Sequence, residues 1–448
     1  MNIKIKRQFS PFQIIIVGFL LAILLGSVLL MIPAATSDGH GAGFLDALFT
    51  SVSAVCVTGL SVKNTAQYWS EFGQAVILLL IQVGGLGVVT VGLAVAMFSG
   101  RKISLLQRST MQAASSSLQL GGMVRFTSFM LKIVFVVEFV GVVCLFPSFA
   151  GEYGIGRGLW YALFHSVSAF CNAGFDLMGA NGGNTSLMGY VGSPAVLLPI
   201  SFLVIAGGIG FLTWDDIVTH GIRIRKYRMQ SKIVLLMTAI LLVGSFAFFY
   251  CLEFSSVQWK GLSGAEQILS AWFQAVSPRT AGFNTVDLTD LSDTGQLVTI
   301  MLMLTGGVSG STAGGFKVNT LAVLLLTMAA VVQKREDAQC FGRRISKESV
   351  YSAVTIFFLY MILFIFGGIV ISCVEQIPLL PALFETASAV GTVGLSLGLT
   401  GSLEIVSKVI LILLMFLGRV GGLTMVFAMV AEKNLSHSQF PEEKITVG

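Results

Sequence analysis

The sequence has few charged residues. Asp, Glu, Lys and Arg make up 11% of its 448 residues, whereas soluble domains average about 25%. Hydrophobic residues account for 55%. A soluble globular protein is therefore excluded, and an integral membrane protein is expected.

The sequence also lacks the signatures of catalysis. It contains no GxxxxGK[ST], no HExxH and no GxGxxG after a strand, so direct ATP coupling, enzymatic chemistry and nucleic-acid binding are not expected. The cysteines show no CxxC or metal-ligand spacing and are predicted to be small, mostly buried side chains without disulfides. They are Cys56, Cys144, Cys171, Cys251, Cys340 and Cys373.

Long apolar segments are abundant instead. About 20 apolar residues suffice to cross a bilayer as a helix. Eight segments meet this length, at 12–32, 74–98, 127–147, 195–214, 232–252, 296–332 (interrupted), 350–374 and 403–431. The first is longer than the apolar part of a signal peptide, about 7–15 residues, and is expected to be retained.

Between the members of each pair lies a shorter apolar segment that is predicted to be a re-entrant half-helix. These segments span 44–56, 159–171, 264–277 and 380–390. Each leads into a glycine, and the glycines Gly59, Gly174, Gly282 and Gly394 are separated by 115, 108 and 112 residues. Such a period indicates a fourfold internal repeat. The predicted repeats cover 1–100, 101–222, 223–340 and 341–433, followed by a polar tail at 434–448.

The distribution of charge predicts the orientation. Lysine and arginine cluster before each repeat and after the last, while the loops with the half-helices hold only Lys63, Arg157, Lys260 and Arg279. By the positive-inside rule, both termini are cytoplasmic and the half-helices face outward. Those outer loops carry 13 acids, which predicts a negative vestibule that concentrates cations.

Four glycine loops at membrane depth suggest a cation filter. Irregular backbone is tolerated there only where it is buried or lines a wet cavity. Rings of backbone carbonyls can replace the hydration shell of a cation, and the C-terminal ends of half-helices favour positive charge. The predicted filter residues are Val57, Thr58, Gly59, Asn172, Ala173, Gly174, Thr280, Ala281, Gly282, Thr392, Val393 and Gly394. Potassium is predicted at Thr58, Asn172, Thr280 and Thr392.

The sixth segment is predicted to contain a gate. Residues 296–332 would form a helix of about 55 Å, against an apolar core of about 30 Å. Its middle, 305–317, is rich in glycine and hydroxyl residues, which disfavours continuous helix. We expect a loop that obstructs the path below the filter, the alternative being a loop that only packs between protomers. Glycine pairs at 84–85, 207–208 and 421–422 are expected to allow close packing in otherwise ordinary helices.

Two intramembrane cations belong to the predicted gate, because charge at that depth is a functional hypothesis by default. Arg419 is expected to donate to loop carbonyls and repel a cation, or only to brace the loop. Lys317 either closes the loop or extends to the cytoplasmic interface. The full set is Gly306, Gly307, Ser309, Gly310, Ser311, Thr312, Gly314, Gly315, Lys317 and Arg419.

The fourfold order of span, half-helix, glycine and span resembles the superfamily of potassium transporters that includes the Trk, Ktr and plant HKT proteins. Eight spans without an extra N-terminal pair are most like the membrane subunit of a Ktr system. The resemblance covers nearly the whole chain. It implies an all-α polytopic membrane protein of the bacterial cytoplasmic membrane, with four repeats arranged pseudo-fourfold around one central pore and Gly59, Gly174, Gly282 and Gly394 in one filter. Members that favour sodium often have serine at the first of these positions, so Gly59 implies that potassium is favoured.

The resemblance also implies partners. It predicts a homodimer in the lipid bilayer and a cytosolic ring of nucleotide-binding regulatory subunits of the RCK/KTN type, with nucleotide bound only by that ring. The basic segments 223–232 and 334–347 are candidate contacts, or simply the positive-inside signature.

These observations predict passive, gated potassium uptake driven by the electrochemical gradient, with stimulation by sodium left open. One charge moved across about 100 mV gains about 2.3 kcal/mol. The alternatives are sodium or mixed sodium/potassium transport, and ion-coupled transport of a small solute. The solute alternative is disfavoured because such transporters often have inverted repeats, whereas two spans per unit make these repeats parallel. A scaffold or receptor without transport would not need four matched loops.

Overall fold

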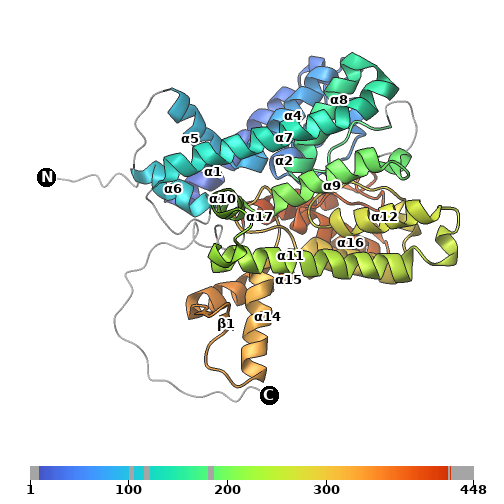
Figure 1. The fold of residues 1–448 in the computed structure, drawn as a ribbon. Coiled ribbons are helices and arrows are strands. Elements are labelled where there is room, and N and C mark those ends of the chain that lie inside the picture. Colours follow the sequence, from blue (N-terminus) through green and yellow to red (C-terminus); the bar gives the residue numbers. More distant parts are fainter. Residues whose placement is uncertain (1–9, 100–104, 116–121, 180–185, 422–423, 425–448) are drawn as a thin grey trace.

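The computed structural model describes residues 10–99, 105–115, 122–179, 186–421 and 424, and these are mostly helical (Figure 1). The predicted tail at 434–448 and Gly422 lie outside the described residues. The expected all-α fold is confirmed.

Each repeat begins with a long helix. In the described part of the chain, the four helices long and apolar enough to cross a membrane unaided all start a repeat. They are α1 (Pro11–Leu30), α7 (Met123–Tyr153), α11 (Met229–Phe248, continued by η4, Phe249–Glu253) and α15 (Lys347–Glu375). In Figure 1, α1, α7 and α11 run along one common direction.

A short buried helix follows each long one, as predicted. These pore helices are α2 (Phe44–Val55), α8 (Ile155–Phe170), α12 (Gly264–Val276) and α16 (Leu379–Gly391). Their C-terminal halves are almost entirely buried and lead directly into the glycine loops. The half-helices expected from the sequence are therefore present, with ends within a few residues of the predicted ones.

The second helix is broken in the first three repeats, which corrects the expectation of ordinary helices in the first two. The segments α4 (Glu71–Leu86) and α5 (Val88–Phe98) meet at 93°, and α9 (Pro194–Gly208) and α10 (Phe211–His220) meet at 99°. In the fourth repeat, α17 (Ile405–Val420) ends at a glycine. Each of these helices ends just before a glycine with φ between +83° and +90°, a backbone angle outside the right-handed helical range. These glycines are Gly87, Gly210 and Gly421.

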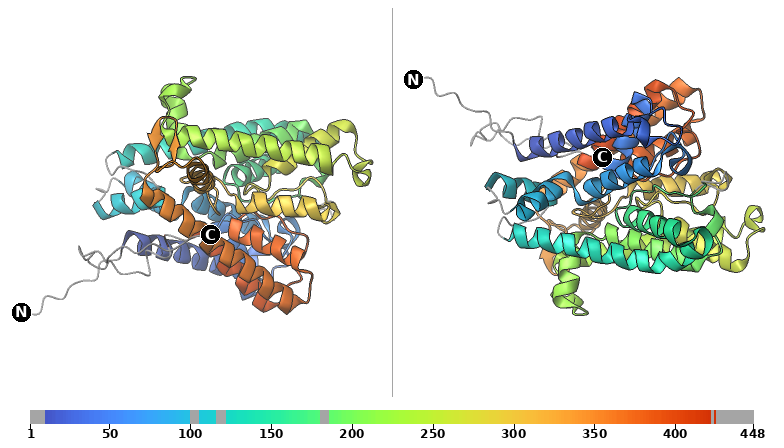
Figure 2. Two further views of the ribbon diagram at one scale, coloured as in Figure 1. Left: turned by 90° about the horizontal axis from the view of Figure 1, so that it is seen from below. Right: turned by 90° about the horizontal axis from the view of Figure 1, so that it is seen from above.

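The third repeat differs in the length of its break. Its halves, α13 (Asp293–Leu304) and α14 (Val318–Val332), are separated by the predicted loop. Figure 1 shows α14 projecting away across the direction of the long helices, and Figure 2 shows it end-on from below. The predicted interruption of 296–332 is thus confirmed, together with a change of chain direction.

A second set of glycines packs these helices against the pore helices. A Cβ on Gly84 would lie 2.0 Å from the Val55 carbonyl oxygen, and one on Gly207 would lie 1.9 Å from that of Phe170. Close packing at the first two glycine pairs is therefore confirmed. In the fourth repeat Gly418 has this role, because a Cβ on Gly418 would lie 2.3 Å from the Val390 carbonyl oxygen. From the sequence, the close packing was expected at 421–422 instead.

Gly84→Ala is expected to destabilise the protein by about 1–3 kcal/mol, because the new methyl group overlaps backbone that cannot move aside. Gly92→Ala is the matched control, since a Cβ on that α5 glycine has nothing within 4 Å. Thermal melting in detergent should show a lower Tm for Gly84→Ala and an unchanged or higher Tm for Gly92→Ala. Equal melting temperatures for the two variants would contradict the packing role.

Shorter elements lie in the connecting segments within and between the repeats. They are η1 (Pro33–Ala35), α3 (Thr65–Tyr68), α6 (Leu105–Ser115), η2 (Met188–Tyr190), η3 (Ile224–Lys226), η5 (Val257–Trp259), η6 (Leu288–Asp290) and the antiparallel strands β1 (Gln339–Cys340) and β2 (Arg343–Arg344). The sequence analysis did not predict α6 or the hairpin.

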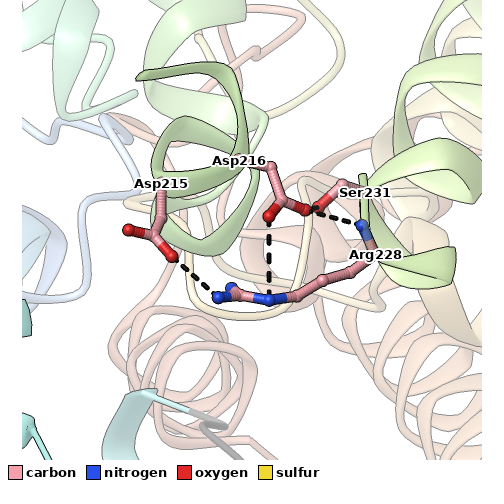
Figure 3. A network of polar contacts seen from close by, with 4 residues as sticks. All are labelled: Asp215, Asp216, Arg228 and Ser231. Carbon is pink, nitrogen blue, oxygen red and sulfur yellow. Dashed lines mark hydrogen bonds and ion pairs between the residues drawn. The ribbon is translucent and has the colours of Figure 1, made fainter. Parts of the chain in front are cut away.

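A polar network fixes the link between the second and third repeats (Figure 3). Asp216 on α10 is buried and accepts hydrogen bonds from the Arg228 backbone N–H at 3.0 Å and the Ser231 hydroxyl at 2.6 Å. The Arg228 guanidinium donates to Asp215 at 2.8 Å. Arg228, within the predicted basic contact segment 223–232, is therefore engaged by the fold itself.

Candidate ion filter and gate loop

The four glycine loops share one unusual backbone conformation. Two residues in each have positive φ: the glycine, at 68° to 96°, and the residue two positions before it, at 51° to 75°. The non-glycine members are Val57, Asn172, Thr280 and Thr392. Such a conformation costs about 1–2 kcal/mol for each non-glycine residue, and strain of this kind clusters at functional sites.

The four glycines lie next to one another in a closed ring. A Cβ added to any of them would lie within 2.8 Å of the carbonyl oxygen of the residue before the glycine in the next repeat. The pairs are Gly59 with Ala173 at 2.4 Å, Gly174 with Ala281 at 2.8 Å, Gly282 with Val393 at 2.3 Å, and Gly394 with Thr58 at 2.2 Å. The structure therefore brings all four predicted loops together, and the ring has no room for a side chain at any of these glycines.

A serine in each pore helix braces the loop behind the ring. Its carbonyl oxygen accepts the N–H of the residue before the filter glycine, at 2.8–2.9 Å. The serines are Ser53, Ser168, Ser277 and Ser388. The Ser168 hydroxyl also donates to the Phe175 carbonyl at 2.7 Å. This role was not predicted from the sequence, although a serine stands six residues before three of the glycines and five residues before Gly282.

The side chains of the first repeat differ in register from the prediction. Thr58 was grouped with Asn172, Thr280 and Thr392, but the backbone places Val57 in line with them and Thr58 one residue nearer the glycine. We call the four residues that stand two positions before the filter glycines the inner ring. Three of its side chains have an oxygen atom, and the fourth is a valine. The Asn172 amide lies 3.1 Å from Thr280 Oγ1.

Two filter hydroxyls are left without a partner. Thr58 Oγ1 and Thr392 Oγ1 are buried and have no hydrogen-bond partner among the described residues. Burying a hydroxyl without a partner is costly. A dehydrated cation in the filter is a ligand that would satisfy such atoms.

The predicted gate loop, 305–317, lies directly against the filter. Its backbone N–H groups at Val308 and Gly315 donate to Gly208 at 3.0 Å and Gly418 at 3.1 Å, which anchors the loop to the second and fourth repeats. A Cβ on Gly314 would lie 2.0 Å from the Thr392 hydroxyl. The loop therefore packs directly against the filter segment of the fourth repeat.

Thr312 connects the loop to the second repeat. Its hydroxyl donates to the Phe170 carbonyl at 3.0 Å, and its backbone N–H faces the Gly207 oxygen at 3.4 Å. Phe170 ends the pore helix two residues before Asn172. The loop thus contacts filter segments from two opposite repeats.

Both predicted cations bind the loop. The Arg419 guanidinium donates to the carbonyls of Thr312 and Gly84, and to that of Gly85 at 3.2 Å. The Lys317 ammonium donates to the carbonyls of Ala313 at 2.7 Å and Gly314 at 3.0 Å. The Lys317 ammonium is therefore hydrogen-bonded to its own loop.

Cavities lie on both sides of this arrangement. A cavity of about 450 Å³ opens outside the glycine ring and is lined by all four filter glycines together with Asp176 and Asp287. A second, of about 280 Å³, lies on the other side of the loop and is lined by Ser309, Lys317 and Arg419, among others. The ring and the loop separate the two.

Asp176 gives the outer cavity a pH-dependent charge. Burial raises the pKa of its carboxyl to about 6, against the hydrogen bond that it accepts from the Met178 N–H at 2.9 Å. Lowering the outer pH through 6 neutralises this acid, so the vestibule attracts cations less strongly.

Rubidium uptake into proteoliposomes should therefore fall as the outer pH drops from about 7 to 5. In Asp176→Asn, uptake should be lower above pH 6 and nearly flat across that range. Asp287→Asn, in the same cavity, should lower uptake without removing the pH step. An unchanged pH profile in Asp176→Asn would contradict the assignment.

Within the described residues, no group of three His, Cys, Asp or Glu side chains is arranged to hold a metal ion. All six cysteines are free thiols, as predicted, although Cys144, Cys251 and Cys373 are exposed rather than buried.

Comparison with known proteins identifies the family. The family model described as TrkH, cation transport protein, matches residues 4–438. The chain is 38% identical to the potassium/sodium uptake protein NtpJ of Enterococcus hirae, covering 100% of this chain and 99% of that one. It is 36% identical to the Ktr system potassium uptake protein B of Bacillus subtilis, covering 98% and 97%.

A solved structure confirms the fold. The potassium transporter TrkH from Vibrio parahaemolyticus matches with a TM-score of 0.74 and 20% identity, covering 96% of this chain and 87% of that one. With the family match over nearly the whole length, the resemblance inferred from the repeats is confirmed. The chain belongs to the TrkH family of cation transport proteins and is a membrane ion transporter, not an enzyme.

Proposed function

We propose that this protein takes up potassium across the bacterial cytoplasmic membrane through a pore that passes along the axis of the glycine ring. The closed ring of Gly59, Gly174, Gly282 and Gly394 carries this proposal, because it brings four backbone segments to one axis. The printed names of the relatives, potassium/sodium uptake protein and potassium uptake protein, support the choice of ion.

The path of the ion follows from the charges along it. Asp176 and Asp287 draw cations into the outer cavity. At the ring the ion exchanges water for carbonyl oxygens, and the C-terminal ends of the pore helices offset its charge. The unpartnered hydroxyls of Thr58 and Thr392 supply further oxygens within the filter. The electrochemical gradient supplies the driving force, at about 2.3 kcal/mol per charge for 100 mV.

The 305–317 loop is the proposed gate. It is anchored to the second and fourth repeats by backbone hydrogen bonds and held by Arg419. Loops of this length without secondary structure are often functional. Opening requires only that a few hydrogen bonds on one side of the loop be exchanged, while the filter behind it stays braced by the pore helices.

Regulation by a partner is part of the proposal. Two relatives are named as components of Ktr systems, which supports a cytosolic partner. We assign nucleotide binding to a ring of RCK/KTN-type subunits docked on a homodimer, with both termini on the same side. The exposed segment from Ile222 to Lys226 adjoins the buried Asp216 network and offers Arg223 and Arg225 as contacts.

Sodium or mixed sodium/potassium uptake is the second candidate. One relative is named a potassium/sodium uptake protein. Val57 supplies no side-chain oxygen to the inner ring, where the other three repeats have Asn172, Thr280 and Thr392. An incomplete ring weakens the preference between cations of different radius.

Flux into proteoliposomes tests the function. Rubidium should enter liposomes that contain the purified protein when the interior is negative, and external potassium should compete better than sodium. Equal competition by the two ions would favour the mixed transporter. If neither ion crosses, even after deletion of 305–317, the pore proposal fails and the ion-coupled solute transporter replaces it.

A further inference from the structure

Each pore helix carries a buried polar residue at one equivalent position. It follows a phenylalanine that is at most 1% exposed. The four residues are Thr50, His165, Gln274 and Glu385, and each is itself no more than 1% exposed. A buried polar side chain needs hydrogen-bond partners, so the partners of these four reveal what the position does.

Glu385 ties its pore helix to the segment that follows the fourth filter glycine. Its Oε1 accepts hydrogen bonds from the Ser396 hydroxyl at 2.5 Å and the Leu397 N–H at 3.1 Å. Its Oε2 accepts one from the Thr400 hydroxyl at 2.7 Å. Ser396 and Thr400 also contact each other at 3.1 Å. Three donors from five residues of chain therefore converge on one carboxyl group.

His165 makes the corresponding contact in the second repeat. Its Nδ1 lies 2.7 Å from the Tyr161 carbonyl, so this nitrogen carries the proton. Nε2 is then free to accept the Leu177 N–H at 3.4 Å. Leu177 and Leu397 both stand three residues after their filter glycines. The same connection thus occurs in two repeats that face each other across the ring.

The third repeat does not make this connection. Gln274 donates from its side chain to Thr299 on α13, at 3.3 Å. The segment after Gly282 is instead held by Ser186, whose hydroxyl accepts the Asn284 N–H at 3.0 Å. The connection is therefore present in repeats two and four and differs in the third, and Glu385 makes more and shorter hydrogen bonds than His165.

We propose that Glu385 is a positioning residue for ion selection, which holds the backbone of the fourth filter loop at its outer end, and that His165 does the same less tightly in the second. The proposal rests on the potassium uptake proposed above. Ser396 and Leu397 immediately follow the bulky residue after Gly394 and line the outer cavity. Releasing them lets the Gly394 carbonyl swing away from the axis, and a ring with one loose carbonyl discriminates less between ions.

The test compares Glu385→Ala with Glu385→Gln in proteoliposomes. The measured quantity is the ratio of potassium to sodium concentrations that halve rubidium uptake. Glu385→Ala should reduce the preference for potassium about tenfold, because three buried donors lose their acceptor. Glu385→Gln should restore most of it, since the amide oxygen can accept from Ser396 and Leu397 while the amide nitrogen donates to Thr400.

Thr386→Val is the matched control. Its hydroxyl is buried on the same helix but bonds only to that helix, at the Ala382 and Leu383 carbonyls, both at 3.1 Å. The Thr386→Val variant should have the same preference for potassium over sodium as the wild type. Where Glu385→Ala fails to fold, the double variant Ser396→Ala, Thr400→Val removes two donors from the loop side, and its preference should shift in the same direction.

The outcomes separate the two proposals. A wild type that carries no potassium-preferring flux overturns the proposed function, whatever the variants do. A selective wild type with an equally selective Glu385→Ala, or with Thr386→Val as impaired as Glu385→Ala, overturns the positioning role alone.

Discussion

Gly59→Ser is expected to reduce the preference for potassium over sodium by about tenfold or more, with cation flux retained, because it disturbs the carbonyl ring directly. The new Cβ would lie 2.4 Å from the Ala173 carbonyl oxygen and 3.0 Å from the Gly174 Cα. Gly59 also has φ +89°, where a side chain costs about 1–2 kcal/mol. The first and second loops must therefore separate, which moves two carbonyls away from the axis.

The control for this variant is Gly154→Ser. Gly154 has a similar φ of +80°, but a Cβ there has nothing within 4 Å. Both variants carry the backbone strain, and only Gly59→Ser crowds the ring. The preference for potassium over sodium, measured by competition against rubidium uptake, should be lower in Gly59→Ser than in the wild type. In Gly154→Ser it should equal that of the wild type. A fully selective Gly59→Ser would show that the ring does not select the ion.

Arg419→Ala is expected to raise rubidium flux by about tenfold or more in the absence of any partner. The guanidinium joins the Thr312 carbonyl of the loop to the Gly84 and Gly85 carbonyls at the end of α4. Its loss leaves these acceptors unpaired, at about 1–3 kcal/mol each when buried, and removes a positive charge from the path. Both effects favour a displaced loop and easier passage of a cation.

Arg419→Lys distinguishes bracing from repulsion. Lysine keeps the charge but cannot reach carbonyls on two elements with a planar fork. If bracing dominates, Arg419→Lys should also raise the flux; if the charge dominates, it should resemble the wild type. Arg344→Ala, which removes an exposed arginine paired with Asp337, should change nothing. A flux in Arg419→Ala at or below that of the wild type would exclude Arg419 from holding the gate shut.

Much of this arrangement could be predicted from the sequence because the same pattern of residues occurs in all four repeats. A helix too short to cross the membrane, followed by a glycine, recurs at nearly constant spacing, and α2 and α16 end within one residue of the predicted limits. The broken third repeat was equally visible, because a helix over 296–332 would greatly exceed the membrane thickness. The lengths and the spacing of apolar segments are therefore enough to predict the pore helices and the interrupted helix.

Other features depend on backbone angles that cannot be predicted from the residue types. Gly87 and Gly210 stand among apolar residues that read as continuous helix, and only their φ of +84° and +83° breaks the chain. Thr58 was grouped with the other hydroxyl residues by chemical type, whereas φ places Val57 in that register. A side-chain type is a weak guide to register where two adjacent residues are both plausible.

Contacts between segments distant in the chain were also missed. No site role was predicted for Glu385 or His165 from the sequence, because their partners, Leu397 and Leu177, lie twelve residues further along. No local pattern predicts that an N–H three residues after a glycine will need an acceptor from the preceding helix. The equivalence of the two contacts emerges only from the hydrogen bonds in the structure.

The most direct test of the central claim is to locate the ion. Crystals grown with thallium or rubidium in place of potassium should give an anomalous peak on the axis of the ring formed by Gly59, Gly174, Gly282 and Gly394, surrounded by carbonyl oxygens from all four loops. We expect that sodium at equal concentration does not displace this peak. Absence of a peak on the axis, with the ion bound elsewhere between the helices, would contradict the assignment of these loops as the filter.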